Sequence, residues 1–220
     1  MRFLFTVKIY CMKKKLYLFA IASLFATSTI FAQTPKTIFA QTPKTFIIDA
    51  GHGGHEIGSK NNQINESEYS LEIAQKIQQL AKEKNINVIL TRNGNDFLDL
   101  QSRVDKINEL NPDLVISLHL NSSTSKELKG AEVYIKKDNT DTQTEKLGNE
   151  LTGLISINSI ENRGLKKANF KILRDAKVPT FLIELGFVSN EKDAEILKST
   201  IHKNLIAEKI VGFFEAYTSI

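Results

Sequence analysis

The chain has almost none of the residues that cross-link a small fold or bind metal through sulfur. Its 220 residues contain one cysteine, Cys11, and no tryptophan. A single cysteine excludes an internal disulfide framework and a cysteine-based metal site. Apolar residues make up 41% of the chain and charged residues 25%, which is typical of a globular protein with a real core. The length predicts one domain, or one domain with a short extra segment.

The chain also has no excess of positive charge outside its N-terminal segment. The whole sequence has a formal net charge of +4, but residues 1–32 hold five of its 29 basic residues and no acid. The remaining chain therefore carries 24 basic and 25 acidic residues, a net charge of −1. This balance gives no support to a nucleic-acid-binding function.

Residues 1–32 differ in composition from everything that follows. The stretch MKKKLYLFAIASLFATSTIFA, which begins at Met12, has three lysines, then a mostly apolar run that ends at the small residue Ala32. This order is typical of a secretory signal peptide, with an uncleaved membrane anchor as the alternative. A true start at Met12 instead of Met1 stays open, and Cys11 would then be absent from the protein.

A direct repeat follows the predicted signal peptide. The sequence TIFAQTPK occurs twice in succession over 29–44, which indicates a duplicated linker and not a structural repeat. Cleavage after Ala32 and cleavage after Ala40 would leave similar mature N-termini, so the site stays open between them. We interpret 33–44 as a linker and 45–220 as one folded domain.

Apolar runs alternate with segments of helical periodicity in this domain. Several runs are continuously apolar, which favours strands that are covered on both faces. The runs are 46–50, 86–91, 113–120, 131–137, 170–173 and 180–185, and the helical segments are 71–81, 97–110, 147–155 and 201–214. We expect a single α/β domain with a twisted, mostly parallel or mixed six-stranded sheet and helices on both faces. His202, in the last helical segment, is expected at the surface.

Polar residues that could take part in catalysis or metal binding stand at the ends of three predicted strands. His52 follows the first strand, His119 ends the third, and Glu184 lies near the end of the last. Ligands of open α/β sheets bind outside the carboxyl ends of the strands, so we expect these side chains at one edge. Asn65 has the character of a helix N-cap, which places Glu66 in the first helical turn near the same edge.

Two histidines and a carboxylate are the ligands of one class of catalytic zinc site. Neutral imidazoles and a single carboxylate leave the cation with net positive charge, so that it acidifies bound water. A second carboxylate is then needed to accept the proton and pass it to the leaving amine. Glu66 and Glu184 are the two acids that the sequence offers for these two roles.

Four stretches together resemble a known family. IIDAGHGG, NESEYSLEIA, DLVISLHLNSS and PTFLIELGFVSN resemble, in order, the motifs of the zinc-dependent N-acetylmuramoyl-L-alanine amidases, the type-3 family of peptidoglycan amidases. The resemblance covers roughly 45–217. It implies that His52, Glu66 and His119 bind one Zn²⁺ per chain and that Glu184 is the catalytic carboxylate.

Other polar residues are assigned to supporting roles. Glu68 is the rival of Glu66 as the second ligand, and His55 is expected to be an exposed bystander. Arg92 and Arg103 are expected to be structural ion-pair residues, with a substrate contact as the alternative for Arg92. The residues expected to orient the ligands, shape the surrounding loops or contact substrate are Asp49, Arg92, Asn121 and Asn190. The short segment after His119 leaves no room for the inserted helix that blocks the site in several family members, so no protein activator is evident.

The resemblance implies a secreted enzyme that cleaves the amide bond between N-acetylmuramic acid and L-alanine in peptidoglycan. We expect it to act in the periplasm or cell wall as a monomer, with no stable membrane anchor after signal cleavage and no nucleic-acid partner. Two alternatives stay open. One is a zinc peptidase or deacetylase acting on another peptidoglycan amide bond, and the other is a cell-wall binding protein without catalysis.

Overall fold

The computed structural model describes residues 43–61 and 63–219. The predicted signal peptide and all but the last two residues of the predicted linker lie outside this range. None of the helices within the described residues combines the length and the apolar character needed to span a membrane. The strands are β1 (Thr45–Ala50), β2 (Asn87–Leu90), β3 (Leu114–Asn121), β4 (Ala131–Lys136), β5 (Asn162–Ala168) and β6 (Thr180–Phe187). The helices are α2 (Glu66–Glu83), α3 (Leu100–Leu110), α4 (Thr142–Ile155), α5 (Lys171–Asp175), α6 (Glu191–Lys198) and α7 (Thr200–Thr218).

The strands form one mixed six-stranded sheet in the order β2-β1-β3-β6-β4-β5. Neighbouring strands are parallel except for β4 and β6, which are antiparallel. The parallel strands β1, β3 and β6 therefore end at the same edge. Ala50 pairs with Leu118, and His119 pairs with Glu184 one residue further along. This register confirms the expected mixed sheet and aligns the three strand ends.

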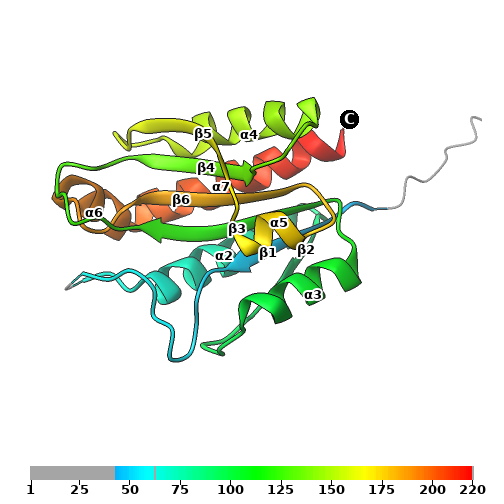
Figure 1. Ribbon diagram of the computed structural model, residues 1–220, viewed down its shortest axis with the longest axis horizontal. Helices are drawn as coiled ribbons and strands as arrows, with labels where there is room; N and C mark the ends of the chain where they lie inside the picture. Colours follow the sequence, from blue (N-terminus) through cyan, green and yellow to red (C-terminus); the bar gives the residue numbers. More distant parts are fainter. Residues whose placement is uncertain (1–42, 62, 220) are drawn as a thin grey trace, which may run out of the picture. The chain divides into compact units, whose positions relative to one another are not determined.

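Helices cover both faces of the sheet, as the continuous apolar strands predicted (Figure 1). On β1, Phe46 and Ile48 face the larger core, which contains buried residues of α2, α4 and α7. Ile47 faces a smaller core with Ile107 of α3 and Ile172 of α5. In Figure 1 α5 lies in front of the sheet and α7 behind it. Because side chains alternate along a strand, the polar side chains at the strand ends belong to the α3/α5 face.

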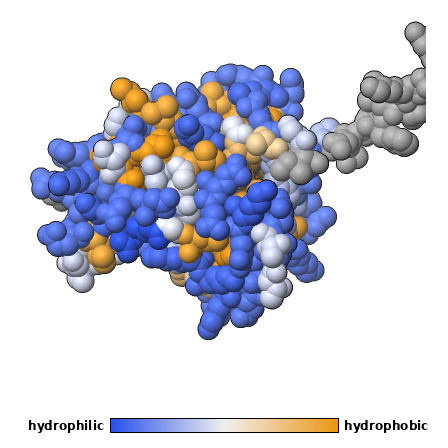
Figure 2. All heavy atoms as spheres, turned by 90° about the horizontal axis from the view of Figure 1, so that it is seen from above, coloured by the Kyte–Doolittle hydropathy of each residue, from blue (hydrophilic) through white to orange (hydrophobic). Residues whose placement is uncertain are grey.

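The prediction of a strand at 170–173 was wrong, and the fifth strand is instead β5. The run FKIL begins the short helix α5, where Ile172 and Leu173 are buried in the smaller core. A four-residue apolar run does not distinguish a strand from a buried helical turn. The strand NRGLKKA escaped prediction because it lies at the sheet edge and is polar, a composition that discourages pairing with another chain. Figure 2 shows the molecule from above the view of Figure 1, so it looks onto the side of β5 and α4. This face is largely hydrophilic.

Two helical faces also differ from expectation. Asp99 caps α3, so Phe97 precedes the helix, and both Phe97 and Leu100 are exposed. In α7, Ile201 is 71% exposed while His202 is only 1% exposed, the reverse of the expected orientation. The buried face of α7 begins with His202 because Ile206 and Phe213, which lie four and eleven positions further on, face the core.

We predict that His202 makes the stability of the domain sensitive to acid. Its Nε2 is buried and has no hydrogen-bond partner among residues 43–61 and 63–219, and burial lowers the pKa of His202 to about 4. The folded state thus binds fewer protons than the unfolded state between pH 6.5 and pH 4, so stability falls as the pH is lowered through this range. His202→Leu should lose less stability than the original protein over that range, by about 3 kcal/mol. Denaturant titrations at pH 7 and pH 4.5 measure this, and parallel losses in both proteins would contradict it.

Candidate metal centre and active site

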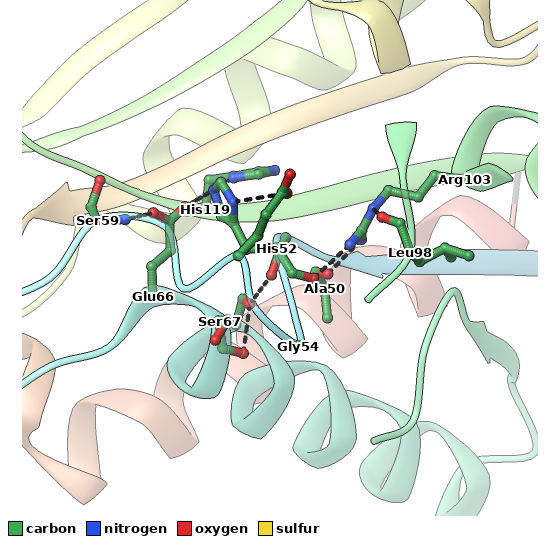
Figure 3. A network of polar contacts seen from close by, with 12 residues as sticks. Ala50, His52, Gly54, Ser59, Glu66, Ser67, Leu98, Arg103 and His119 are labelled. Carbon is green, nitrogen blue, oxygen red and sulfur yellow. Dashed lines mark hydrogen bonds and ion pairs between the residues drawn. The ribbon is translucent and has the colours of Figure 1, made fainter. Parts of the chain in front are cut away.

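Three ionisable side chains meet at the aligned strand ends (Figure 3). Glu66 Oε1 lies 3.2 Å from His52 Nε2 and 2.9 Å from His119 Nδ1. One ligand atom from each of the three residues lies within 4.8 Å of the others. Glu68 is exposed on the opposite side of the first turn of α2, so the geometry selects Glu66 between the two rival carboxylates.

Glycines make the close approach of these residues sterically feasible. His52 itself has a positive φ of 58°, so the chain turns sharply as β1 ends. A Cβ at Gly58 would lie 2.4 Å from Glu66 Oε2 and 2.6 Å from His52 Cδ2. A Cβ at Gly51 would lie 2.5 Å from the His119 ring. Only glycine therefore fits at these two positions beside the three side chains.

Backbone amides and imidazoles hold the Glu66 carboxylate in its ionised form. Asn65 caps α2, as predicted, by accepting a hydrogen bond from the Ser67 amide. Glu66 is 2% exposed and accepts hydrogen bonds from the amides of Ser59, at 2.5 Å, and Leu120, at 3.1 Å. Burial raises the pKa of Glu66, but the contacts with His119 and His52 outweigh it and hold this pKa well below its usual range. A buried anion between two imidazoles, with donor atoms this close, fits a divalent cation.

Glu184 stands beside this group without a partner of its own. It pairs with His119 across β3 and β6, so the two side chains lie on the same face of the sheet. Its Oε2 is buried and forms no hydrogen bond with the described residues. Burial, with help from the nearby charges of Glu66 and Glu132, raises the pKa of Glu184 to about 7 against the opposite effect of His119 and His52. A carboxyl group with this pKa exchanges protons near neutral pH.

Glu132 is part of the site's electrostatics and was missed in the sequence. It pairs with Glu184 across β4 and β6 and is 2% exposed. Arg163, Lys166 and Tyr134 all donate hydrogen bonds to its carboxylate. Burial raises the pKa of Glu132, but these three donors outweigh burial and lower it, so the group stays ionised. An isolated acid in the otherwise apolar run AEVYI was the available signal.

Arg92 and Arg103 lie buried beneath the loop that carries His52. Arg92 donates to the carbonyls of Gly51, at 2.9 Å, and Ser67, at 2.7 Å, and so ties β1 to the first turn of α2. The expectation of an ion pair was wrong for Arg92, which forms none with the described residues. Arg103 donates to the His52 carbonyl at 2.5 Å (Figure 3). It also forms the buried ion pair expected of it, with Asp49 at 2.6 Å. Both guanidinium groups thus hold the backbone that presents the ligands.

The remaining candidate residues lie outside the group of His52, Glu66 and His119. The Asn190 side chain caps α6 and donates to the Lys126 carbonyl at 2.6 Å. The Asn121 side chain accepts a hydrogen bond from the amide of Ser122 at 2.8 Å. His55 is exposed and packs against the ring of Phe97, with 4.2 Å between ring centroids.

A cleft of about 580 Å³ opens in front of the three side chains. His52, His119 and Glu184 are among the residues that line it. Its apolar lining comes from the loop before α3 and the first residue of α3, from the N-cap and first turn of α5, and from β6: Leu98, Leu100, Phe170, Ile172 and Leu182. A concave, largely apolar site with a few converging polar groups is typical of a substrate pocket.

The sequence and the fold both match known amidases. The sequence profile of the N-acetylmuramoyl-L-alanine amidase family matches residues 46–215. The chain is 31% identical over 176 residues to the probable cell wall amidase LytH of Staphylococcus saprophyticus, covering 79% of this chain and 58% of LytH. It is 30% identical over 164 residues to the N-acetylmuramoyl-L-alanine amidase LytC of Bacillus subtilis, covering 74% of this chain and 33% of LytC. The chain thus spans little more than half of LytH and a third of LytC.

The fold gives an independent comparison. The crystal structure of an N-acetylmuramoyl-L-alanine amidase from Clostridium difficile 630 superposes with a TM-score of 0.75 and 28% sequence identity. The match covers 81% of this chain and 98% of that structure. The chain belongs to the N-acetylmuramoyl-L-alanine amidase family.

Proposed function

We propose that the protein hydrolyses the amide bond between the lactyl group of N-acetylmuramic acid and the L-alanine of the peptidoglycan stem peptide. The observation that carries this proposal is the position of Glu184, whose unpartnered carboxyl oxygen is buried beside the His52, Glu66 and His119 group. A purely structural carboxylate at that depth would be paired, because an unpaired one is costly to bury. Family membership supplies the substrate class.

The cofactor in this proposal is one Zn²⁺ per chain, held by His52, Glu66 and His119. Two imidazole nitrogens and one carboxylate oxygen are a donor set that suits zinc and leaves a coordination position for water. When bound, Zn²⁺ would acidify water and polarise the amide carbonyl. Asp49 and Arg92 act behind the ligands, and Asn121 and Asn190 shape the loops around them.

Glu184 carries the proton through the reaction. As a carboxylate it accepts a proton from the water whose oxygen attacks the carbonyl carbon of the amide. The neutral carboxyl group then donates that proton to the alanine nitrogen as the carbon–nitrogen bond breaks. The products are a lactyl carboxylate and a peptide with a free N-terminal L-alanine. The pKa near 7 lets one group perform both steps at neutral pH.

We further propose that the protein acts outside the cytoplasmic membrane. Relatives of the chain include proteins named as cell wall amidases, and their peptidoglycan substrate lies in the envelope. The leader over 1–32 would deliver the protein there and be removed. We propose a monomer that acts in the periplasm or cell wall without a membrane anchor.

Digestion of purified peptidoglycan tests the reaction. The protein should release peptides that begin with L-alanine, identified by N-terminal labelling and mass spectrometry. Glu184→Gln should lower the rate by at least about 100-fold while binding as much zinc as the original protein. Glu109→Gln, which changes an exposed carboxylate that does not line the cleft, is the control and should remain active.

The products also separate the alternatives. A new amine on glucosamine or inside the stem peptide would move the reaction to another amide bond. Binding to the wall without release of any product would replace catalysis with a binding function. Full activity of Glu184→Gln would remove Glu184 from the mechanism.

The burial of Glu184 should also make the unfolding free energy of the zinc-free protein depend on pH. Its folded pKa of about 7 lies above the ordinary value of 4.5 for a glutamate, so the folded state binds more protons between these values. The original protein should therefore lose stability relative to Glu184→Gln as the pH rises from about 4.5 to 7, by about 3 kcal/mol. Urea titrations in the presence of a chelator at pH 5 and pH 8 measure the difference. A constant difference between the two proteins would show that Glu184 is not held in its neutral form.

A further inference from the structure

A row of buried polar side chains continues from the back of His119 into the domain. His119 Nε2 lies 3.1 Å from Ser117 Oγ, on the side of the ring away from Glu66. Ser117 Oγ lies 2.7 Å from Asp49 Oδ2. The other carboxylate oxygen, Asp49 Oδ1, accepts hydrogen bonds from Thr91 Oγ1 at 2.7 Å and Arg103 Nη1 at 2.6 Å. None of the four residues behind His119 is more than 4% exposed.

The donors and acceptors in this row leave one consistent arrangement. Asp49 accepts a hydrogen bond from Arg103, which can only donate. Asp49 is therefore an ionised carboxylate and accepts every hydrogen bond that its neighbours in the row make to it. The single hydroxyl proton of Ser117 therefore points to Asp49. The Ser117 oxygen then has only lone pairs to offer to the imidazole, so the proton on His119 Nε2 donates to Ser117. This leaves His119 Nδ1, which faces Glu66, as the nitrogen available for a cation.

Asp49 is also connected to the second histidine, His52, through Arg103. Arg103, which is paired with Asp49, donates from Nη2 to the backbone carbonyl of His52 at 2.5 Å. His52 has a left-handed backbone conformation with a φ of 58°, which needs support from its surroundings. Asp49 is thus connected to the His119 ring through Ser117 and to the His52 backbone through Arg103.

We propose that Ser117 is a positioning residue for the metal centre: it fixes the orientation and the tautomer of His119, and Asp49 fixes Ser117. This rests on the proposed zinc ligation by His52, Glu66 and His119, and deepens it. Ser117 lines the base of the cleft but is 0% exposed, and in this role it contacts His119 and not substrate or metal. Partners of this kind on the far side of a ligating histidine raise metal affinity by 10- to 100-fold in other proteins.

Thr91 offers a matched control for Ser117. Each residue donates one buried hydroxyl to Asp49 at 2.7 Å, but only Ser117 contacts His119. Zn²⁺ affinity of the full chain should be measured by competition with a chromophoric chelator, beside thermal unfolding of the zinc-free proteins. We expect Ser117→Ala to bind Zn²⁺ about 10- to 100-fold more weakly. Thr91→Val should stay within about threefold of the original affinity, although it loses a comparable hydrogen bond.

Equal affinities for Ser117→Ala and Thr91→Val would overturn the positioning role, because the network would then serve stability alone. A second measurement needs no variant and applies even where Ser117→Ala does not fold. Long-range ¹H–¹⁵N correlation spectra of the zinc-loaded protein should show His119 with its proton on Nε2. A proton on Nδ1 would overturn the proposal directly.

Failure of this inference can be distinguished from failure of the proposed function. Tight zinc binding and release of L-alanine peptides by the original protein, with no effect of Ser117→Ala, would leave the amidase function standing and remove only the role of Ser117. A folded original protein that binds no zinc would remove both.

Discussion

The site depends on the parallel alignment of β1, β3 and β6. Backbone hydrogen bonds fix the register of these strands, so their carboxyl ends stop at one level. His52 emerges from the first strand, His119 sits at the end of the second, and Glu184 faces it from the third. Glu66 is then added by the first turn of α2. Groups far apart in the sequence are brought within contact distance by a framework whose geometry is set by main-chain atoms.

Charge is the second constraint on this edge of the sheet. Several carboxylates are buried close together, and each except Glu184 has donors that keep it ionised. Glu66 has two imidazoles and two amides, Asp49 has Arg103, and Glu132 has Arg163 with two further donors. Of these carboxylates, only Glu184 has a buried oxygen without a hydrogen-bond partner in the part of the chain that the structure describes. The environments therefore divide the carboxylates into fixed anions and one exchangeable proton site, which is a division of roles that acid–base chemistry requires.

Sequence reasoning succeeded where local pattern determines structure. Continuous apolar runs marked β1, β3 and β6, and the rule that sites form at strand ends placed His119 and Glu184 at one edge. It failed for β5 and α5, since a polar edge strand has no apolar signature and four apolar residues fit a helical turn as well as a strand. Ser117 and Glu132 could not be assigned roles, because a serine or acid inside an apolar strand acquires a role only from partners on other strands. The family resemblance already favoured Glu66 over Glu68, and the direction of each side chain in the first turn of α2 agrees with that choice.

Metal content and zinc-edge absorption spectroscopy of the purified protein test whether His52, Glu66 and His119 together hold one zinc ion. The purified protein should hold about one Zn²⁺ per chain, with two imidazole nitrogens at about 2.0–2.1 Å and oxygen ligands for the rest. His52→Ala should lose the metal, while His55→Ala, three residues further on, should keep it. A folded protein that binds no zinc, or a His52→Ala variant that retains it with an unchanged spectrum, would contradict the account.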